Sequence, residues 1–192
     1  MFAGHFGLAA AVKAKAPKVP LWAIMTSTQL LDIAFVPLFI KGIEPIETIA
    51  GGGYGNAIIH ADYTHSLVGA LLIAVLAGLA ASLAWGKQGA WVISSVVFSH
   101  WILDLLVHRA DLPIFPGNAF DLPLLGLGMW KWPFASVIAE LLILVIGFVM
   151  YARSLQRRSG NIGNKTKVWI ASGVMALLLI LSLVTDFFGT GV

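Results

Sequence analysis

The chain has 192 residues, of which 59% are hydrophobic and only 11% are charged, and its mean hydropathy is +0.91. Because soluble domains carry about 25% charged residues, this composition excludes an ordinary water-soluble globular domain. The absence of cysteine excludes a disulfide framework, thiolate metal ligands and a cysteine nucleophile, so nitrogen and oxygen atoms would have to hold any metal.

The first apolar segment ends in a basic stretch that contains Lys13, Lys15 and Lys18. A secretory signal carries its positive charges ahead of its apolar core, so the segment does not fit one. Because these lysines should lie at the inner membrane surface, the residues before them cannot form a separate crossing. We expect a re-entrant half-helix that dips in from the inner side and places His5 about 12 Å deep.

Long, continuous apolar segments fill most of the remaining chain. A transmembrane helix needs about 20 predominantly apolar residues, whereas the strands of a membrane barrel would alternate apolar and polar residues. We therefore expect residues 1–192 to form one all-α transmembrane bundle with about five spanning helices. The expected spans are Leu21–Ile40, Ser66–Trp85, Ala90–Leu106, Pro133–Tyr151 and Val168–Phe188.

The basic residues are distributed unevenly between the two sides of this predicted bundle. Lysine and arginine concentrate in cytoplasmic loops, so the larger set should lie inside and the smaller set, Lys41, Arg109 and Lys131, outside. The net charge of +3 is thus a topology signal and indicates no nucleic-acid partner. We expect a multi-pass protein of a bacterial-type inner (plasma) membrane, with its N-terminus in the cytoplasm and its C-terminus outside. The inner set is Lys13, Lys15, Lys18, Lys87, Arg153, Arg157, Arg158, Lys165 and Lys167.

The first, third and fourth predicted spans contain four imidazole or carboxyl side chains, those of Asp32, His100, Asp104 and Glu140. Each costs roughly 2.5–3.5 kcal/mol at a helix centre on insertion scales, and such groups normally face one another, a cavity or an ion. Counted from the inner helix ends at about 1.5 Å per residue, Asp32, His100 and Glu140 all lie near the middle of the bilayer. His65 lies at the outer end of the second span. These residues should converge.

The third predicted span presents several possible ligands on one face. His100, Asp104 and His108 are spaced i, i+4, i+8, and residues four apart stack on the same helical face. Asp111 returns to this face one turn later. A helix with this pattern can direct several donor groups into a bundle.

Four sequence elements also resemble a known family. They are Gly4-His5; Leu31-Asp32; the stretch from His60 to Ser66 with its Thr64-His65-Ser66 core; and His100-Trp-Ile-Leu-Asp104. Together they resemble the membrane-bound metal-dependent hydrolases, the LexA-regulated, YdjM-like inner-membrane group, over roughly residues 2–116. Their order is also similar to that in the zinc phospholipase C and single-strand nuclease superfamily. Where the family often has Asp-x-Asp, this chain has Asp32-Ile-Ala34, which removes support for a second metal ion.

The resemblance implies a hydrolytic metal centre with imidazole and carboxylate ligands, which suit Zn²⁺ and also Mn²⁺. Glu140 and Asp111 would be further ligands, outer partners or the general base. The expected substrate is a phosphoester or a lipid-linked molecule that enters from the outer leaflet, and the expected partners are membrane lipids. The predicted metal ligands are His5, Asp32, His65, His100, Asp104 and His108.

Other interpretations of the same residues remain open. The cluster could be a set of ion pairs without metal, or a metal or ion-pair staple in a non-catalytic subunit of a larger membrane complex with partner proteins. A proton or ion carrier would need a path to both sides, and the inner halves of the spans are almost purely apolar. A haem held by two histidines is disfavoured by the carboxylates at the same depth. His60 is as readily a solvated surface histidine as a ligand, and Arg109 could simply pair with Asp111.

Overall fold

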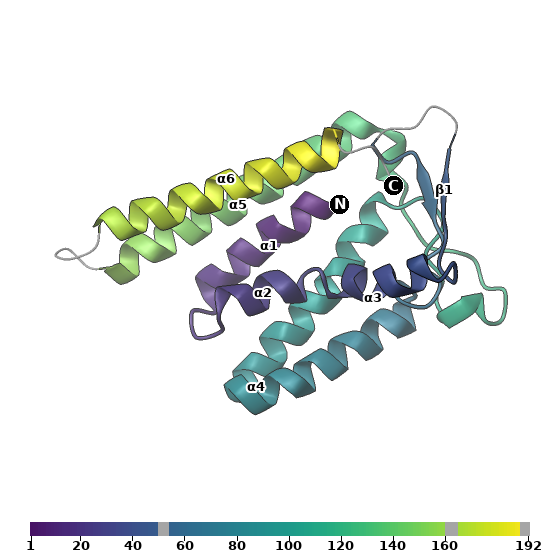
Figure 1. Cartoon of the computed structure of the whole chain (residues 1–192), viewed down its shortest axis with the longest axis horizontal. Coiled ribbons are helices and arrows are strands. Elements are labelled where there is room, and N and C mark those ends of the chain that lie inside the picture. Colours follow the sequence, from purple (N-terminus) through teal and green to yellow (C-terminus); the bar gives the residue numbers. More distant parts are fainter. Residues whose placement is uncertain (50–53, 160–164, 189–192) are drawn as a thin grey trace.

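The computed structural model describes residues 1–49, 54–159 and 165–188, and it is mostly helical (Figure 1). Three helices, α4, α5 and α6, are long and apolar enough to cross a membrane, and α2 and α3 together could make a fourth, broken span. The expectation of five spans is therefore met only in part. The helices are α1 (Phe2–Lys15), α2 (Leu21–Ser27), α3 (Leu30–Ile40), α4 (Leu67–Val107), α5 (Pro133–Ser159) and α6 (Lys165–Phe188).

Helix α4 contains both the second and the third predicted spans, and it bends sharply between them. Gly86 has φ 62° and ψ −161°, a conformation that is essentially restricted to glycine. The two halves then run back along each other, so that the Ser94 hydroxyl donates to the Ala74 carbonyl over 2.8 Å. Figure 1 shows α4 as an open V. This turn brings His100 and Asp104 back toward the start of the helix.

The first predicted span is not one continuous helix. It is broken into α2 and α3, which meet at an angle of 48°. The break leaves Thr28 and Gln29 between the two helices, and the Thr28 carbonyl oxygen accepts a hydrogen bond from the ring of His100. A polar contact inside the bundle thus accompanies the interruption.

The prediction of an all-α fold is wrong in the long loop after α3. Strands β1 (Ile46–Thr48) and β2 (Ala57–Ile59) form a small antiparallel sheet with Ile46 opposite Ile59. β-Branched residues favour such pairing, and the ladder satisfies backbone groups beside the bundle. The loop after α4 contains the short 3₁₀ helices η1 (Pro116–Asn118) and η2 (Met129–Lys131) and an isolated antiparallel bridge between Leu112 and Leu125.

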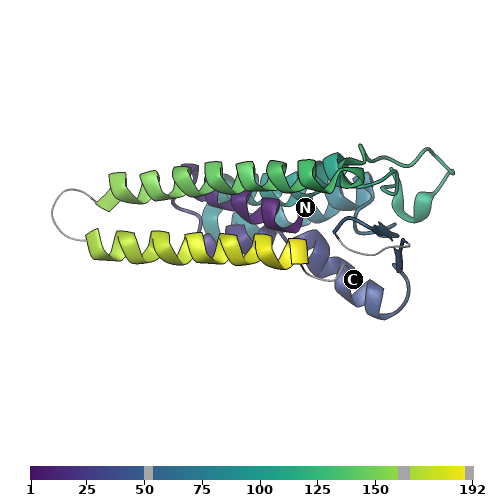
Figure 2. The same ribbon diagram turned by 90° about the horizontal axis from the view of Figure 1, so that it is seen from above.

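Helix α1 lies inside the bundle, parallel to α5 (Figures 1 and 2), and its re-entrant position in a membrane stays a prediction. Its N-terminal turn buries His5, and at its other end the Ala14 carbonyl accepts hydrogen bonds from Ser154 and Arg158. Figure 2 also shows α5 and α6 side by side along their length. The basic ends of α1, α5 and α6 and the bend of α4 lie at one end of the molecule, and the small sheet lies at the other (Figure 1).

The outer faces of the long helices are apolar. In the most apolar stretch of α6 only 17% of the residues are buried, and in those of α4 and α5 28%. Large side chains such as Leu83, Phe134 and Trp169 are mostly exposed. Soluble monomers rarely expose apolar patches of this extent, so the surface is consistent with a membrane protein.

Helices α1 and α5 pack closely where Gly7 faces Gly147. A Cβ atom at Gly147 would collide with the backbone carbonyl of Gly7, so Gly147→Ala should push the helices apart and destabilise the protein by about 1–3 kcal/mol. Gly173 on α6 has open space around it, and Gly173→Ala should stay within about 1 kcal/mol of the wild type. Thermal unfolding in detergent compares the two; equal effects would argue against close α1–α5 packing.

Candidate metal site

Three ligand atoms from different segments form a nearly equilateral triangle. The Nε2 atoms of His65 and His100 are 3.3 Å apart, and each lies 3.5 Å from Oδ1 of Asp32. A tetrahedral Zn²⁺ with bonds of about 2.0–2.1 Å requires its ligand atoms to be about 3.3–3.4 Å apart. The triangle therefore has the dimensions of one face of a zinc site.

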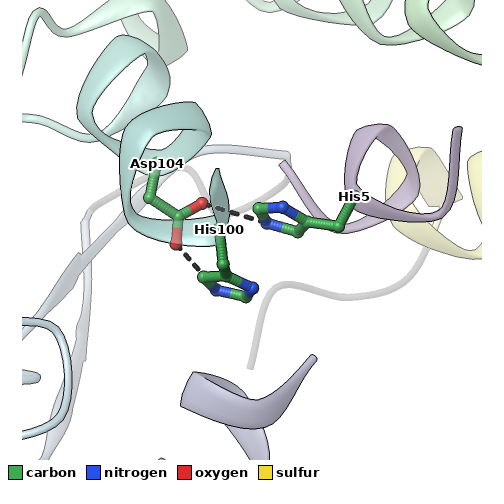
Figure 3. Close-up of side chains that lie close together, drawn as sticks. All are labelled: His5, His100 and Asp104. Atoms are coloured by element: carbon green, nitrogen blue, oxygen red, sulfur yellow. Dashed lines mark ion pairs between the residues drawn. The ribbon is translucent and has the colours of Figure 1, made fainter. Parts of the chain in front are cut away.

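Asp104 supplies a further oxygen to the same place. Its Oδ2 lies 2.9 Å from Nε2 of His100 and 3.7 Å from Nε2 of His65. Its other oxygen, Oδ1, lies 3.2 Å from Nε2 of His5, as Figure 3 shows. His5 also stacks on His100, with ring centroids 3.8 Å apart. We call His5, Asp32, His65, His100 and Asp104 the donor cluster; it contains two sets of three metal-binding groups that share His100.

The local sequence explains how these side chains meet. His100 and Asp104 lie one turn apart on the second half of α4, and Asp32 lies in the first turn of α3. His65 directly precedes the N-cap of α4, Ser66, whose hydroxyl accepts a hydrogen bond from the Gly69 amide over 3.0 Å. This cap is the kind that starts a helix efficiently, and it sets His65 opposite His100.

Hydrogen bonds to the outer ring nitrogens determine which histidine nitrogen faces the cluster. Nδ1 of His100 donates to the Thr28 carbonyl oxygen over 2.6 Å, because a carbonyl can only accept. Nδ1 of His65 lies 3.0 Å from the Thr64 hydroxyl, which itself donates to Glu44. When neutral, both rings therefore carry their hydrogen on Nδ1 and present the lone pair of Nε2 inward, as metal-binding histidines do.

The donor cluster concentrates negative charge. Two imidazole lone pairs and two carboxylates repel one another inside a largely buried cluster, where charge interactions are stronger than in water, and the Met1 ammonium, 3.6 Å from Oδ1 of Asp104, offsets one carboxylate. Protonation of both rings would place two cations 3.3 Å apart, whereas protonation of His100 alone would pair it with Asp32 and Asp104. A divalent cation at the same place would balance the carboxylates and use both Nε2 lone pairs, so the donor set also fits a metal ion.

The cluster is closed on most sides and opens toward a cavity of about 330 Å³. The side chains of His65, His100 and Asp104 are at most 5% exposed, whereas that of Asp32 is 40% exposed. The cavity walls come from α1, α3, α4, α6, the small sheet and η2, and they are mainly apolar. The site is therefore accessible to a small molecule.

His108 and Asp111, which were predicted for the site, lie beside the cluster as a pair. Nδ1 of His108 is 3.0 Å from Oδ1 of Asp111, and both residues are buried. The His108 ring packs against Trp130 and lines the same cavity as the donor cluster, whereas Asp111 does not line it. Neither residue belongs to the two donor sets found among the described residues.

Glu140 lies near the cluster but contacts other groups. Its side chain accepts a hydrogen bond from the Gly4 amide over 3.1 Å and another from the Tyr54 hydroxyl. It thus stabilises the N-terminus of α1, where a carboxylate is favoured. Burial and the Glu140 carboxylate raise the pKa of the Tyr54 phenol above its usual range. A catalytic role for Glu140 stays a prediction.

His60 lies outside the cluster, and Glu44 is a residue that sequence reasoning missed. The ring of His60 is 36% exposed and pairs with Glu47 over 3.2 Å, as expected for a surface histidine. Glu44 belongs to a polar loop of the sequence, yet it is fully buried and is bound to Thr64. No local pattern signals this contact, because the two residues are distant in sequence.

No protein-family profile, curated protein or solved structure matches this chain. The likeness to the membrane-bound metal-dependent hydrolases therefore remains a prediction from four short elements.

Proposed function

We propose that this chain is a membrane-embedded, metal-dependent hydrolase. The observation that carries the proposal is the donor cluster at the wall of a cavity, with Asp32 exposed and the other donors buried. Structural metal sites are closed, whereas catalytic sites keep a position open for water or substrate. An accessible cluster is the arrangement that hydrolysis requires.

The metal would be held by Asp32, His65, His100 and Asp104, with His5 supporting the second oxygen of Asp104. Zinc suits these imidazole and carboxylate donors best, and manganese is the second choice. When bound, such an ion supplies Lewis acidity and makes a water molecule a competent nucleophile at neutral pH.

His108 would move a proton in this reaction. It lines the cavity, and its Nδ1 is hydrogen-bonded to Asp111. The other ring nitrogen, Nε2, is therefore the one available for proton transfer. An imidazole oriented by a carboxylate is a common general acid or base. Asp111 would then act through His108 and not directly on the substrate.

The substrate would be a phosphoester or another lipid-linked molecule taken from the outer leaflet. Apolar residues such as Phe2, Phe35 and Val36 line the cavity beside the donors, which suits the chain of a lipid. If the two halves of α4 are separate spans and α2 with α3 is another, the bundle has five crossings. The basic helix ends then lie at the cytoplasmic surface, and the cluster lies toward the outer one.

Single cysteines test this orientation, because the natural chain contains none. Lys87 at the bend of α4 and Glu47 in the small sheet are both exposed. In intact bacterial cells, an impermeant maleimide should label Glu47→Cys at once and Lys87→Cys only after the membrane is opened. The reverse order would refute the proposed orientation.

The activity is tested on protein loaded with Zn²⁺ in nanodiscs. The probes are bis(p-nitrophenyl) phosphate, p-nitrophenyl esters and a short-chain phosphatidylcholine. We expect metal-dependent turnover of at least one probe, and Asp32→Asn should lower it at least about 100-fold. The exposed carboxylate variant Glu47→Gln should have the wild-type rate.

A metal-loaded wild type that hydrolyses none of these probes would count against the hydrolase. If it also co-purified with a constant set of partner proteins, the alternative would be favoured, namely a non-catalytic subunit in which the same cluster is structural.

A further inference from the structure

Glu44 is a charged residue in an unusual position, because it is fully buried in the loop between α3 and β1. No salt bridge joins it to a lysine or arginine in the described part of the chain. Its carboxylate instead accepts hydrogen bonds from the amides of Tyr63 and Thr64, over 2.6 and 2.9 Å, and from the Thr64 hydroxyl over 2.9 Å. A buried carboxylate is costly unless it is bonded in this way.

The hydrogen bonds continue from Glu44 through Thr64 to the donor cluster, and the donor of each can be assigned. Thr64 has one hydroxyl hydrogen, and an ionised carboxylate can only accept it. The Thr64 oxygen is then an acceptor for the hydrogen on Nδ1 of His65, 3.0 Å away. This leaves a lone pair on Nε2 of His65, the atom that faces His100, Asp32 and Asp104.

We propose that Glu44 is a positioning residue of the metal site, acting through Thr64 to hold His65 in its metal-binding tautomer. The proposal rests on the proposed metal site. Carboxylates that bind a ligating histidine directly fix its tautomer and raise its basicity. Here a threonine hydroxyl stands between the carboxylate and the ring and transmits the same effect.

The contacts of Glu44 also tie its loop to the residues that precede α4, so a variant of Glu44 alone would mix two roles. Thr64 separates the two roles, because its hydroxyl is the group that hydrogen-bonds to both Glu44 and His65. Thr64→Val removes this hydroxyl while keeping the shape, and Thr64→Ser keeps it. Both variants retain the backbone amides that bind Glu44.

Metal affinity is the first readout, measured by competition between the purified protein and a chromophoric zinc chelator. Thr64→Val and Glu44→Gln should each weaken Zn²⁺ binding by about 10- to 100-fold, and Thr64→Ser should restore most of it. Glu47→Gln, on the exposed side of the same loop, should bind as the wild type does. Wild-type affinity in Thr64→Val would overturn the proposal, even if Glu44→Gln failed to fold.

The tautomer of His65 is the second readout, and it needs no metal. In metal-free protein labelled with ¹⁵N-histidine, the His65 signals, assigned with a His65→Gln variant, should show the Nδ1–H form. Thr64→Val should lose this preference, whereas Thr64→Ser should keep it. An Nε2–H form in the wild type, or the same spectrum in Thr64→Val, would refute the role of Glu44.

The two readouts separate this inference from the metal site on which it rests. A wild type that binds no zinc but shows the expected tautomer, lost in Thr64→Val, would contradict the proposed function and support the positioning by Glu44. Zinc binding without the tautomer preference would support the metal site and contradict the positioning role of Glu44.

Discussion

Replacing His100 with alanine is expected to abolish stoichiometric metal binding. His100 is the one residue shared by both sets of donors, and its Nε2 lies within 3.5 Å of atoms from His65, Asp32 and Asp104. The loss should exceed the 10- to 100-fold effect that is typical of an outer partner. Elemental analysis of the purified protein gives the number of metal ions per chain.

The matched control is His60→Ala, which removes an exposed histidine that pairs only with the surface residue Glu47 among its described ion pairs. This variant should keep the metal content of the wild type. Far-ultraviolet circular dichroism shows whether each variant remains helical. If His100→Ala retains its metal, or if the wild type contains none, the cluster is a set of ion pairs and the hydrolase proposal fails.

Much of the donor cluster could be predicted from sequence because depth and helical period are local properties. The spacing of His100 and Asp104 places them on one face of a helix, whatever the rest of the chain does. Counting along an apolar segment gives the depth of Asp32. The half-helix expected from the basic residues after α1 stays a prediction, but it led us to expect His5 near the cluster, where the structure has it.

The remaining features depend on contacts between distant segments. The bond between the Thr28 carbonyl and His100, and the burial of Glu44 by Thr64, join residues that no periodicity relates. The pairing of β1 with β2 could not be predicted either, because short segments within a polar loop carry little sequence signal for strand formation. Glu140 shows most clearly what sequence alone cannot predict: its depth was predicted from the helix, but its contact with the start of α1 was not.

Removing the metal should destabilise the protein more than any single surface change would. Binding to the folded state alone stabilises it by about 4 kcal/mol when free metal is 1,000 times its Kd. For a chain of this size, that corresponds to a rise of roughly 10 °C in Tm. We therefore expect a chelator to lower the Tm of the wild type by about this amount and added Zn²⁺ to restore it, as followed by thermal unfolding in detergent.

The variant Asp104→Asn distinguishes a metal site from an ion-paired cluster in the same experiment. If the cluster binds metal, the apo wild type holds two carboxylates against two imidazole lone pairs, while the Met1 ammonium lies 3.6 Å from Oδ1 of Asp104. Loss of the repulsion and loss of this ion pair oppose each other, so removing the Asp104 charge should change the stability of the apo form little. Asp104→Asn should then melt below the wild type in zinc but close to it in chelator. If Asp104 instead pairs with a protonated His100 only 2.9 Å away, the variant should melt lower under both conditions, since breaking a buried ion pair is costly. Because only the ion-paired arrangement predicts a clearly lower Tm in chelator, one pair of melting curves decides between them.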